Sequence, residues 1–274
     1  MKSAFLSLED PQTVSLLDET SLWSAPFGEL LLEAVPCRSG MKFLDIGPGT
    51  GFPLLELAQR LGDSEAFGID PWDRGRERIE SKSKLLGLRN VRIMPGVGEK
   101  LPFEKNYFDL IVSNNGLNNV ADIGKTLDEC RRTLRRNAPL VFTVNLPGSM
   151  REFYIILKKV LRRNDLEDII PAVDRHIHSK RLQESEWISL LRGHGFTGIV
   201  KRKSTFSFRF SDASAMFNHF FMRIAFIPAW DEIVPEADRE KIFGDVRREL
   251  DRAARAEGSI HLTIPMICFT CRKK

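Results

Sequence analysis

The 274-residue sequence has few groups for cross-linking or for phenolic chemistry, with four cysteines and two tyrosines. A chain of this length can bury a stable core without disulfides. Its formal net charge of +4 is the small difference between 41 basic and 37 acidic residues, so the charge balance predicts no nucleic-acid partner. Hydrophobic residues make up 42% and charged residues 28%, which indicates a globular chain and excludes a mainly disordered one.

The sequence also lacks a long uninterrupted hydrophobic run. Its most apolar stretch, residues 217–234, contains Pro228 and several charged residues, so no membrane span is predicted. The first residues do not combine a basic region with an apolar run and a cleavage site. We therefore expect no secretory signal and a cytoplasmic location.

A metal centre is not predicted either. Cys268 and Cys271 form a single CxxC without a second ligand pair, and they lie in an apolar run that reads as a β-strand. Free cysteines in such runs are commonly buried, so structural cysteines are the favoured interpretation over zinc binding or redox chemistry.

Short apolar runs alternate with helical patterns through the first half of the chain. Strands are expected at residues 41–46, 66–70, 91–94, 108–113 and 140–144, and helices at residues 53–62, 73–87 and 122–136, with Asp73 as an N-cap. This alternation predicts a parallel sheet with right-handed crossovers and helices on both faces.

The regular alternation of strands and helices ends after Leu146. Residues 151–163 predict a basic amphipathic helix, 166–181 an irregular segment and 184–191 another helix. Two long strands, at 199–210 and 259–271, bracket a helical segment from 213 to 256. The predicted fold class is α/β, with a Rossmann-like seven-stranded sheet that is mostly parallel, an antiparallel C-terminal strand, and a helical insertion before that last strand.

A glycine-rich turn, Gly47-Pro48-Gly49-Thr50-Gly51, follows the first strand. Such a turn lets the backbone approach a ligand and places free N–H groups of the next helix beside it. The dinucleotide fingerprint requires a third glycine where this sequence has Phe52, and no Gly-Lys-Ser/Thr of a P-loop is present. The turn alone therefore predicts a nucleotide-like cofactor without naming it.

Four ordered signals carry a family resemblance. They are Leu44–Gly51, Gly68-Ile69-Asp70, Glu99–Phe103 and Phe108–Ser113. In this order they resemble the class I S-adenosylmethionine-dependent methyltransferases, in particular the branch of the ubiquinone/menaquinone-biosynthesis-type enzymes. The resemblance covers residues 27–145 well and the remainder only as architecture. It implies a methyltransferase with S-adenosylmethionine as cofactor and no metal.

The resemblance implies a cofactor-binding role for fourteen residues. The glycine turn would wrap the methionine part, Asp45 would hold the turn or the amino group, and the Asp70 carboxylate would accept both ribose hydroxyls. Adenine would lie between Pro71-Trp72 and the loop after the third strand, and the end of the fourth strand would lie near the methyl group. The set is Asp45, Gly47, Pro48, Gly49, Thr50, Gly51, Asp70, Pro71, Trp72, Val97, Gly98, Glu99, Ser113 and Asn114.

One position departs from the family pattern. Val97 stands where relatives often have an Asp that accepts from the adenine amino group, so backbone groups of Val97 and Gly98 would have to bind that edge. Asn118-Asn119 stands where relatives often carry histidines, and its role is open. Trp72 is explained as well by packing in the core as by contact with adenine. Asp45 could equally cap the turn that follows it.

The expected organisation is a single methyltransferase domain over residues 1–274. It comprises an N-terminal helical cover at 1–36, a cofactor-binding core at 37–146, and acceptor-side insertions at 147–183 and 212–257. The insertions hold Phe217, Phe220, Phe221, Met222, Phe226 and Trp230, a helical stripe that suits a core or a hydrophobic acceptor. A small, hydrophobic acceptor molecule is predicted. The sequence predicts neither a catalytic residue nor an oligomeric state.

Histidines offer no catalytic pattern. His176, His178 and His219 have no partner at a fixed spacing and are interpreted as surface or packing residues.

Two rival functions remain. A NAD-dependent dehydrogenase would share the first unit, but Phe52 disfavours it. A non-catalytic cofactor-binding or interaction protein would use the basic helix 151–163 to dock RNA, protein or a membrane surface.

Overall fold

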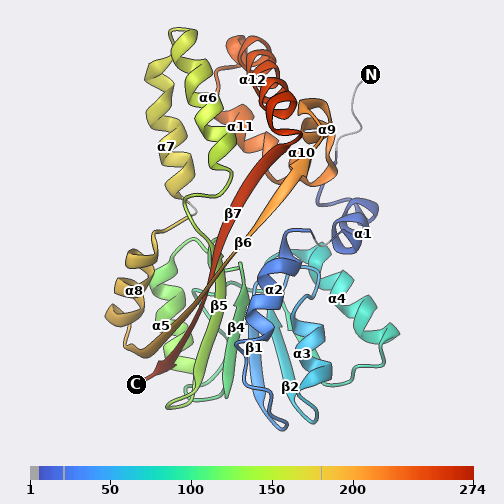
Figure 1. Ribbon diagram of the computed structural model, residues 1–274. Helices are drawn as coiled ribbons and strands as arrows, with labels where there is room; N and C mark the ends of the chain where they lie inside the picture. Colours follow the sequence, from blue (N-terminus) through green and yellow to red (C-terminus); the bar gives the residue numbers. More distant parts are fainter. Residues whose placement is uncertain (1–5, 21, 180) are drawn as a thin grey trace. The chain divides into compact units, whose positions relative to one another are not determined.

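A computed structural model describes residues 6–20, 22–179 and 181–274 of the chain. Seven strands form one sheet in the order β3-β2-β1-β4-β5-β7-β6 (Figure 1). The strands are β1 (Lys42–Ile46), β2 (Glu65–Ile69), β3 (Val91–Met94), β4 (Leu110–Asn114), β5 (Pro139–Asn145), β6 (Phe196–Phe210) and β7 (Ile260–Lys273).

The first five strands pair in parallel, and β7 runs antiparallel to β5 from Asn145↔Met266 to Pro139↔Arg272. Parallel strands need both faces covered, which is why β1, β4 and β5 are almost wholly buried. The predicted fold class is confirmed, including the antiparallel C-terminal strand.

Twelve α-helices and one short 3₁₀ helix are assigned in the described residues. They are α1 (Pro11–Glu19), α2 (Ser24–Leu32), α3 (Leu54–Arg60), α4 (Asp73–Leu85), α5 (Ile123–Thr133), α6 (Arg151–Arg163), η1 (Glu167–Ile169), α7 (Ile170–Ser179), α8 (Glu184–Gly193), α9 (Ala213–Asn218), α10 (Phe220–Ala225), α11 (Ile227–Ile233) and α12 (Glu236–Glu257). None of the described helices is long and apolar enough to cross a membrane.

The chain divides into two compact units. The sheet unit comprises Glu9–Asn145, Gln183–Ser204 and Met266–Lys274. The helical unit consists mainly of Leu146–Leu182 and Thr205–Pro265. The expected insertions 147–183 and 212–257 fall in the helical unit apart from Gln183. A single domain with an acceptor-side role for these insertions stays a prediction.

In the sheet unit, the N-terminal helices pack on the binding-core elements. Asp18 of α1 forms ion pairs with Arg78 (2.8 Å) and Lys82 (2.7 Å) of α4. A Cβ at Gly28 of α2 would lie 2.0 Å from the Phe52 ring, so glycine is required there for the helix to contact this side chain. The segment before β1 is therefore attached to the elements on either side of the glycine turn.

The helical unit has an aromatic core. Phe153 of α6 stacks on Trp230 of α11 with ring centroids 3.7 Å apart, and both side chains are fully buried. Most of the aromatic stripe predicted in this region is buried here: Phe217, Phe221, Met222, Phe226 and Trp230. These side chains stabilise the unit itself.

The basic face of α6 is largely paired within the same unit. Lys159 and Arg163 contact Glu249 of α12 at 2.8 and 2.9 Å, and Lys158 pairs with Asp174 of α7. These contacts pair three of the five basic side chains of the helix that the sequence suggested for docking.

Two local predictions were wrong. The segment expected to be irregular is helical over 167–179, which η1 and α7 occupy, with Pro171 in the first turn of α7, where a missing N–H costs nothing. Asp73 is not the N-cap of α4. That position belongs to Trp72, whose backbone is extended, and Asp73 lies one residue inside the helix and pairs with Arg76.

Candidate functional site

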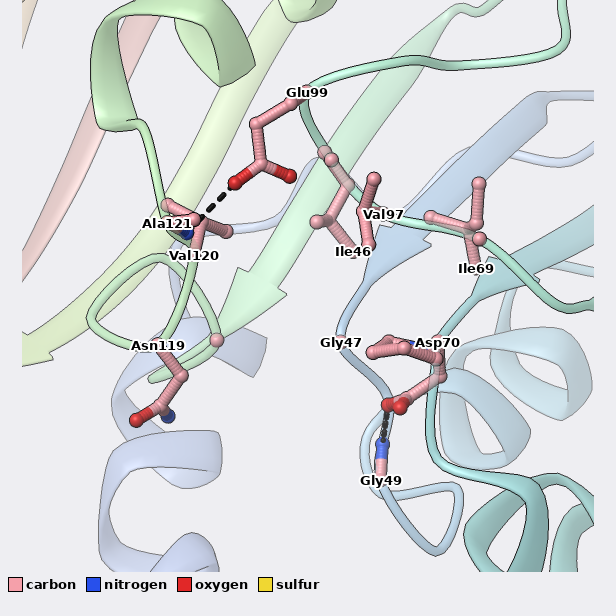
Figure 2. A pocket seen from close by; sticks show the side chains of 14 residues that line it. Ile46, Gly47, Gly49, Ile69, Asp70, Val97, Glu99, Asn119, Val120 and Ala121 are labelled. Atoms are coloured by element: carbon pink, nitrogen blue, oxygen red, sulfur yellow. Dashed lines mark hydrogen bonds between the residues drawn. The ribbon is translucent and has the colours of Figure 1, made fainter.

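A pocket of about 410 Å³ lies at the carboxyl ends of strands in the sheet unit (Figure 2). This volume is within the range of small-molecule sites, and strand ends of this kind are where open α/β sheets bind ligands. Its lining comes from the ends of β1 and β2 and from the loops after β3 and β4: Ile46, Gly47, Gly49, Ile69, Asp70, Pro71, Gly96, Val97, Gly98, Glu99, Gly116, Asn119, Val120 and Ala121.

The glycine turn adopts a backbone that other residues rarely tolerate. Gly47, Gly49 and Gly51 have φ of +73°, +58° and +110°. The Gly47 N–H donates to the Ile69 carbonyl at 2.9 Å, and the Gly51 N–H donates to the Pro48 carbonyl at 2.8 Å. The turn is therefore fixed to the end of β2, and the bare backbone of Gly47 and Gly49 faces the pocket.

Helix α4 approaches this turn closely through Gly75. A Cβ at Gly75 would lie 2.6 Å from the Gly49 carbonyl oxygen and 2.5 Å from the Trp72 ring. The Trp72 ring therefore packs beside Gly75 and is not among the lining residues. Its neighbour Pro71 does line the pocket.

The Asp70 carboxylate joins the end of β2 to the glycine turn. Its Oδ2 accepts a hydrogen bond from the Gly49 N–H and its Oδ1 accepts one from the Trp72 N–H, both at 2.9 Å. Each oxygen retains a further lone pair, so the carboxylate can still accept two hydroxyl groups from a ligand (Figure 2).

Burial raises the pKa of Asp70, which is 6% exposed. The hydrogen bonds from Trp72 and Gly49 and the positive charge of Arg76 oppose that shift. Ligand hydroxyls donated to the carboxylate would favour its charged form further.

Asp45 lies beneath the turn, fully buried and outside the pocket lining. Neither of its carboxylate oxygens has a hydrogen-bond partner among the described residues. Burial, and after it the charge of Asp70, raises the pKa of Asp45 well above 3.8. The Leu54 N–H favours the charged form without meeting the geometry of a hydrogen bond. The environment therefore favours a protonated Asp45.

The opposite wall of the pocket is the segment from Gly116 to Ala121. Glu99 holds this wall in place, because its Oε1 accepts from the N–H groups of Ala121 at 2.7 Å and Asp122 at 3.0 Å (Figure 2). Asp122 is the N-cap of α5. Val97, which is 44% exposed, and Gly98 lie between Glu99 and the end of β3.

Seven of the fourteen predicted residues line the pocket, and seven do not. Those lining it are Gly47, Gly49, Asp70, Pro71, Val97, Gly98 and Glu99; the others are Asp45, Pro48, Thr50, Gly51, Trp72, Ser113 and Asn114. Ser113 instead donates from Oγ to the Ile46 carbonyl at 2.7 Å, and Asn114 donates from Nδ2 to the Ser24 carbonyl at 3.0 Å. These two side chains tie β4 to β1 and to α2.

Sequence reasoning missed the other lining residues. Ile46, Ile69 and Gly96 end or follow strands, and their position next to the predicted residues was a usable signal. Gly116 has a further reason to be glycine, since its Cβ would lie 2.5 Å from the Ile46 carbonyl oxygen. Asn119 was noted without a role, and Val120 and Ala121 had no signal of their own.

Comparison with known proteins matches residues 44–142 to the methyltransferase domain family. The chain is 36% identical over 105 residues to a demethylmenaquinone methyltransferase of Staphylococcus aureus, covering 38% of this chain and 43% of that protein. It is 37% identical over 125 residues to the ubiquinone/menaquinone biosynthesis C-methyltransferase UbiE of Idiomarina loihiensis, covering 43% and 49%. The chain thus spans less than half the length of these two relatives.

Solved structures extend the likeness of the fold. The crystal structure of YcgJ from Bacillus subtilis superposes with a TM-score of 0.61 at 18% identity, covering 91% of this chain and 99% of that one. Phosphoethanolamine N-methyltransferase 2 of Haemonchus contortus, solved with S-adenosyl-L-methionine, gives a TM-score of 0.60 at 13% identity, covering 97% and 58%. At these identities the likeness shows the fold alone.

Proposed function

Because the chain belongs, through residues 44–142, to the class I S-adenosylmethionine-dependent methyltransferases, we propose that it binds S-adenosylmethionine in the pocket and transfers the methyl group to a small apolar acceptor. The observation that carries the proposal is the contact between the Asp70 carboxylate and the Gly49 N–H at the pocket floor. It places a hydroxyl-binding acid beside a turn with bare backbone.

Different lining residues would contact different parts of the expected cofactor. Gly47 and Gly49 present backbone to the methionine part, and Asp70 accepts the ribose hydroxyls through its free lone pairs. Pro71, Val97 and Gly98 supply the adenine surface, with the Val97 side chain giving apolar contact in place of a carboxylate acceptor.

The remaining predicted residues act behind this surface. Gly51 gives the turn its backbone conformation, and Ser113 fixes the end of β1 through Ile46. Thr50 is near enough to Asp18 of α1 to help lower the pKa of that carboxyl. Asp45 is buried in β1, two residues before Gly47, and is not part of the pocket lining.

Bound S-adenosylmethionine supplies an electrophilic methyl group on a positively charged sulfur. Displacement in line with that bond forms the new bond from the methyl carbon to the acceptor as the bond to sulfur breaks, and it requires an aligned acceptor and little water. S-adenosylhomocysteine leaves, and a proton carried by the acceptor atom passes to solvent. Both titratable side chains of the pocket lining, Asp70 and Glu99, are engaged with backbone N–H groups. We therefore assign them to binding and positioning rather than to general-base catalysis.

An apolar acceptor fits the composition, since the chain has 19 Phe and two Tyr. Two of the relatives above are named for menaquinone or ubiquinone biosynthesis. A demethylated isoprenoid quinone is therefore the first acceptor to test, followed by smaller apolar phenols and amines.

The test is incubation of the full chain with methyl-labelled S-adenosylmethionine and demethylmenaquinone that dithionite has reduced to its quinol, in detergent micelles. The proposal predicts release of S-adenosylhomocysteine and transfer of label to an apolar product, with loss of both in Asp70→Ala. The matched control is Glu80→Ala, which removes an exposed acid of α4. If neither the quinone nor any apolar acceptor of the panel gains label while the chain stays folded, the proposal is wrong.

A further inference from the structure

Arg181 is a buried guanidinium in the helical unit that lacks partners for two of its nitrogens. Its side chain is 6% exposed, and neither Nε nor Nη1 has a hydrogen-bond partner in the described part of the chain. A guanidinium stays charged at every physiological pH. Burying such a charge without an acceptor is costly, so an uncompensated one indicates a ligand that completes it.

The surroundings of Arg181 are polar groups set in an aromatic core. The guanidinium carbon lies 5.8 Å from the centre of the Tyr154 ring, within cation–π range. The Tyr154 hydroxyl lies 3.2 Å from Trp230 Nε1 and 3.1 Å from His176 Nε2. Tyr154 and Trp230 are 3% and 0% exposed.

The guanidinium of Arg181 carries a fixed positive charge beside Tyr154. The indole N–H is only a donor, so the Tyr154 oxygen accepts from Trp230. The nearby ammonium of Lys158 is already paired with Asp174.

We propose that the helical unit binds a small monocarboxylate whose oxygens accept hydrogen bonds from Nε and Nη1 of Arg181, beside the Tyr154 ring. A singly charged carboxylate neutralises one guanidinium, and its planar pair of oxygens suits guanidinium donors. A phosphate dianion would need a second cation.

This inference concerns the helical unit alone and does not depend on methyl transfer, so it is tested without S-adenosylmethionine. The full chain is titrated with benzoate, phenylacetate and indole-3-acetate, with the matching neutral amides, and with inorganic phosphate. At least one carboxylate should bind about tenfold more tightly than its amide, the effect of one charge-assisted hydrogen bond. That preference should be lost in Arg181→Gln and retained in Arg175→Gln, which removes an exposed arginine of α7.

A second readout separates binding from a structural role. If the buried charge is uncompensated without ligand, Arg181→Met should unfold at a higher temperature than the parent while losing stabilisation by carboxylates. The proposal is overturned if no carboxylate outcompetes its amide, if phosphate binds as well as the carboxylates, or if Arg181→Gln keeps the preference. A fall in the unfolding temperature of Arg181→Met would assign the side chain to folding instead.

Discussion

The Oδ2 atom of Asp70 lies 2.9 Å from the backbone nitrogen of Gly49, so an acid at the end of β2 is bonded directly to the glycine turn after β1. Twenty-one residues separate the two positions. The parallel pairing of β1 and β2, in which Ile46 is paired with Ile69, brings these strand ends together. Asp70 thereby shapes the turn and offers its remaining lone pairs to the pocket.

Replacing Asp70 with Ala should lower affinity for S-adenosylmethionine by about 10- to 100-fold. The change removes the acceptor of two ribose hydroxyls, and a hydrogen bond to a charged group contributes about 1.5–3 kcal/mol. Calorimetric titration measures the effect, with Glu80→Ala as control. Equal affinity of Asp70→Ala and the parent would mean that the ribose is not bound here.

Glu99→Gln should raise the KM for S-adenosylmethionine by about three- to tenfold and leave kcat nearly unchanged. The amide oxygen can still accept from Ala121 and Asp122, but charge-assisted bonds are roughly twice as strong as neutral ones. Steady-state kinetics distinguish this positioning effect, because loss of a base would lower kcat instead. Glu104→Gln, an exposed acid in the same loop region, is the control.

Gly75→Ala should weaken cofactor binding by moving α4 away from the turn. The new Cβ would lie 2.6 Å from the Gly49 carbonyl oxygen, which is backbone and cannot swing aside. The matched control is Gly244→Ala within α12, where the nearest atom is Arg248 Nη1 at 3.7 Å. That control should stabilise the chain by about 0.5–1 kcal/mol. Thermal unfolding and calorimetry on both variants check the contrast.

Asp45→Asn should change how stability depends on pH. The native pKa of Asp45 is raised well above 3.8, so the native state keeps a proton that the unfolded chain has already lost. The contribution of this group to the free energy of unfolding is therefore largest at or below pH 3.8. It is lost as pH rises through the native pKa, by at most about 1.4 kcal/mol per pH unit. Denaturant unfolding of parent and variant over this range should show a difference that grows with pH. A constant difference would place the carboxylate in a solvated site.

The stability contributed by Glu249 should depend on pH in the opposite direction from that of Asp45. Its contacts with Lys159 and Arg163 lower its pKa from 4.5 to about 2. The stability that it contributes is present above pH 4.5 and is lost as pH falls through about 2. Glu249→Gln should therefore be less stable than the parent at neutral pH and lose less stability on acidification. Parallel acid-unfolding curves for the two proteins would show that the ion pairs add nothing.

The sequence predicted the sheet and half of the pocket lining for one shared reason. Strand, turn and helix signals can be recognised from short stretches of sequence. Parallel pairing then brings the residues that follow successive strands, here Gly47, Asp70 and Glu99, to the same edge of the sheet. The wall at Asn119, Val120 and Ala121 could not be predicted in this way. Its place depends on hydrogen bonds that the backbone N–H groups of Ala121 and Asp122 donate to Glu99, more than twenty residues earlier.

The wrong predictions have equally local causes. Asp73 was expected to cap α4, but Trp72 holds the N-cap position with an extended backbone, and Asp73 lies one residue inside the helix. Helix α7 lies in the segment 166–181 that was expected to be irregular, and its Pro171 is in the first helical turn, where proline is well tolerated.

Calorimetric titration of the parent chain with S-adenosylmethionine and, separately, with NAD shows directly which cofactor the pocket binds. We expect saturable binding of one S-adenosylmethionine per chain and none of NAD under the same conditions. Absence of S-adenosylmethionine binding, or tighter binding of NAD, would contradict it.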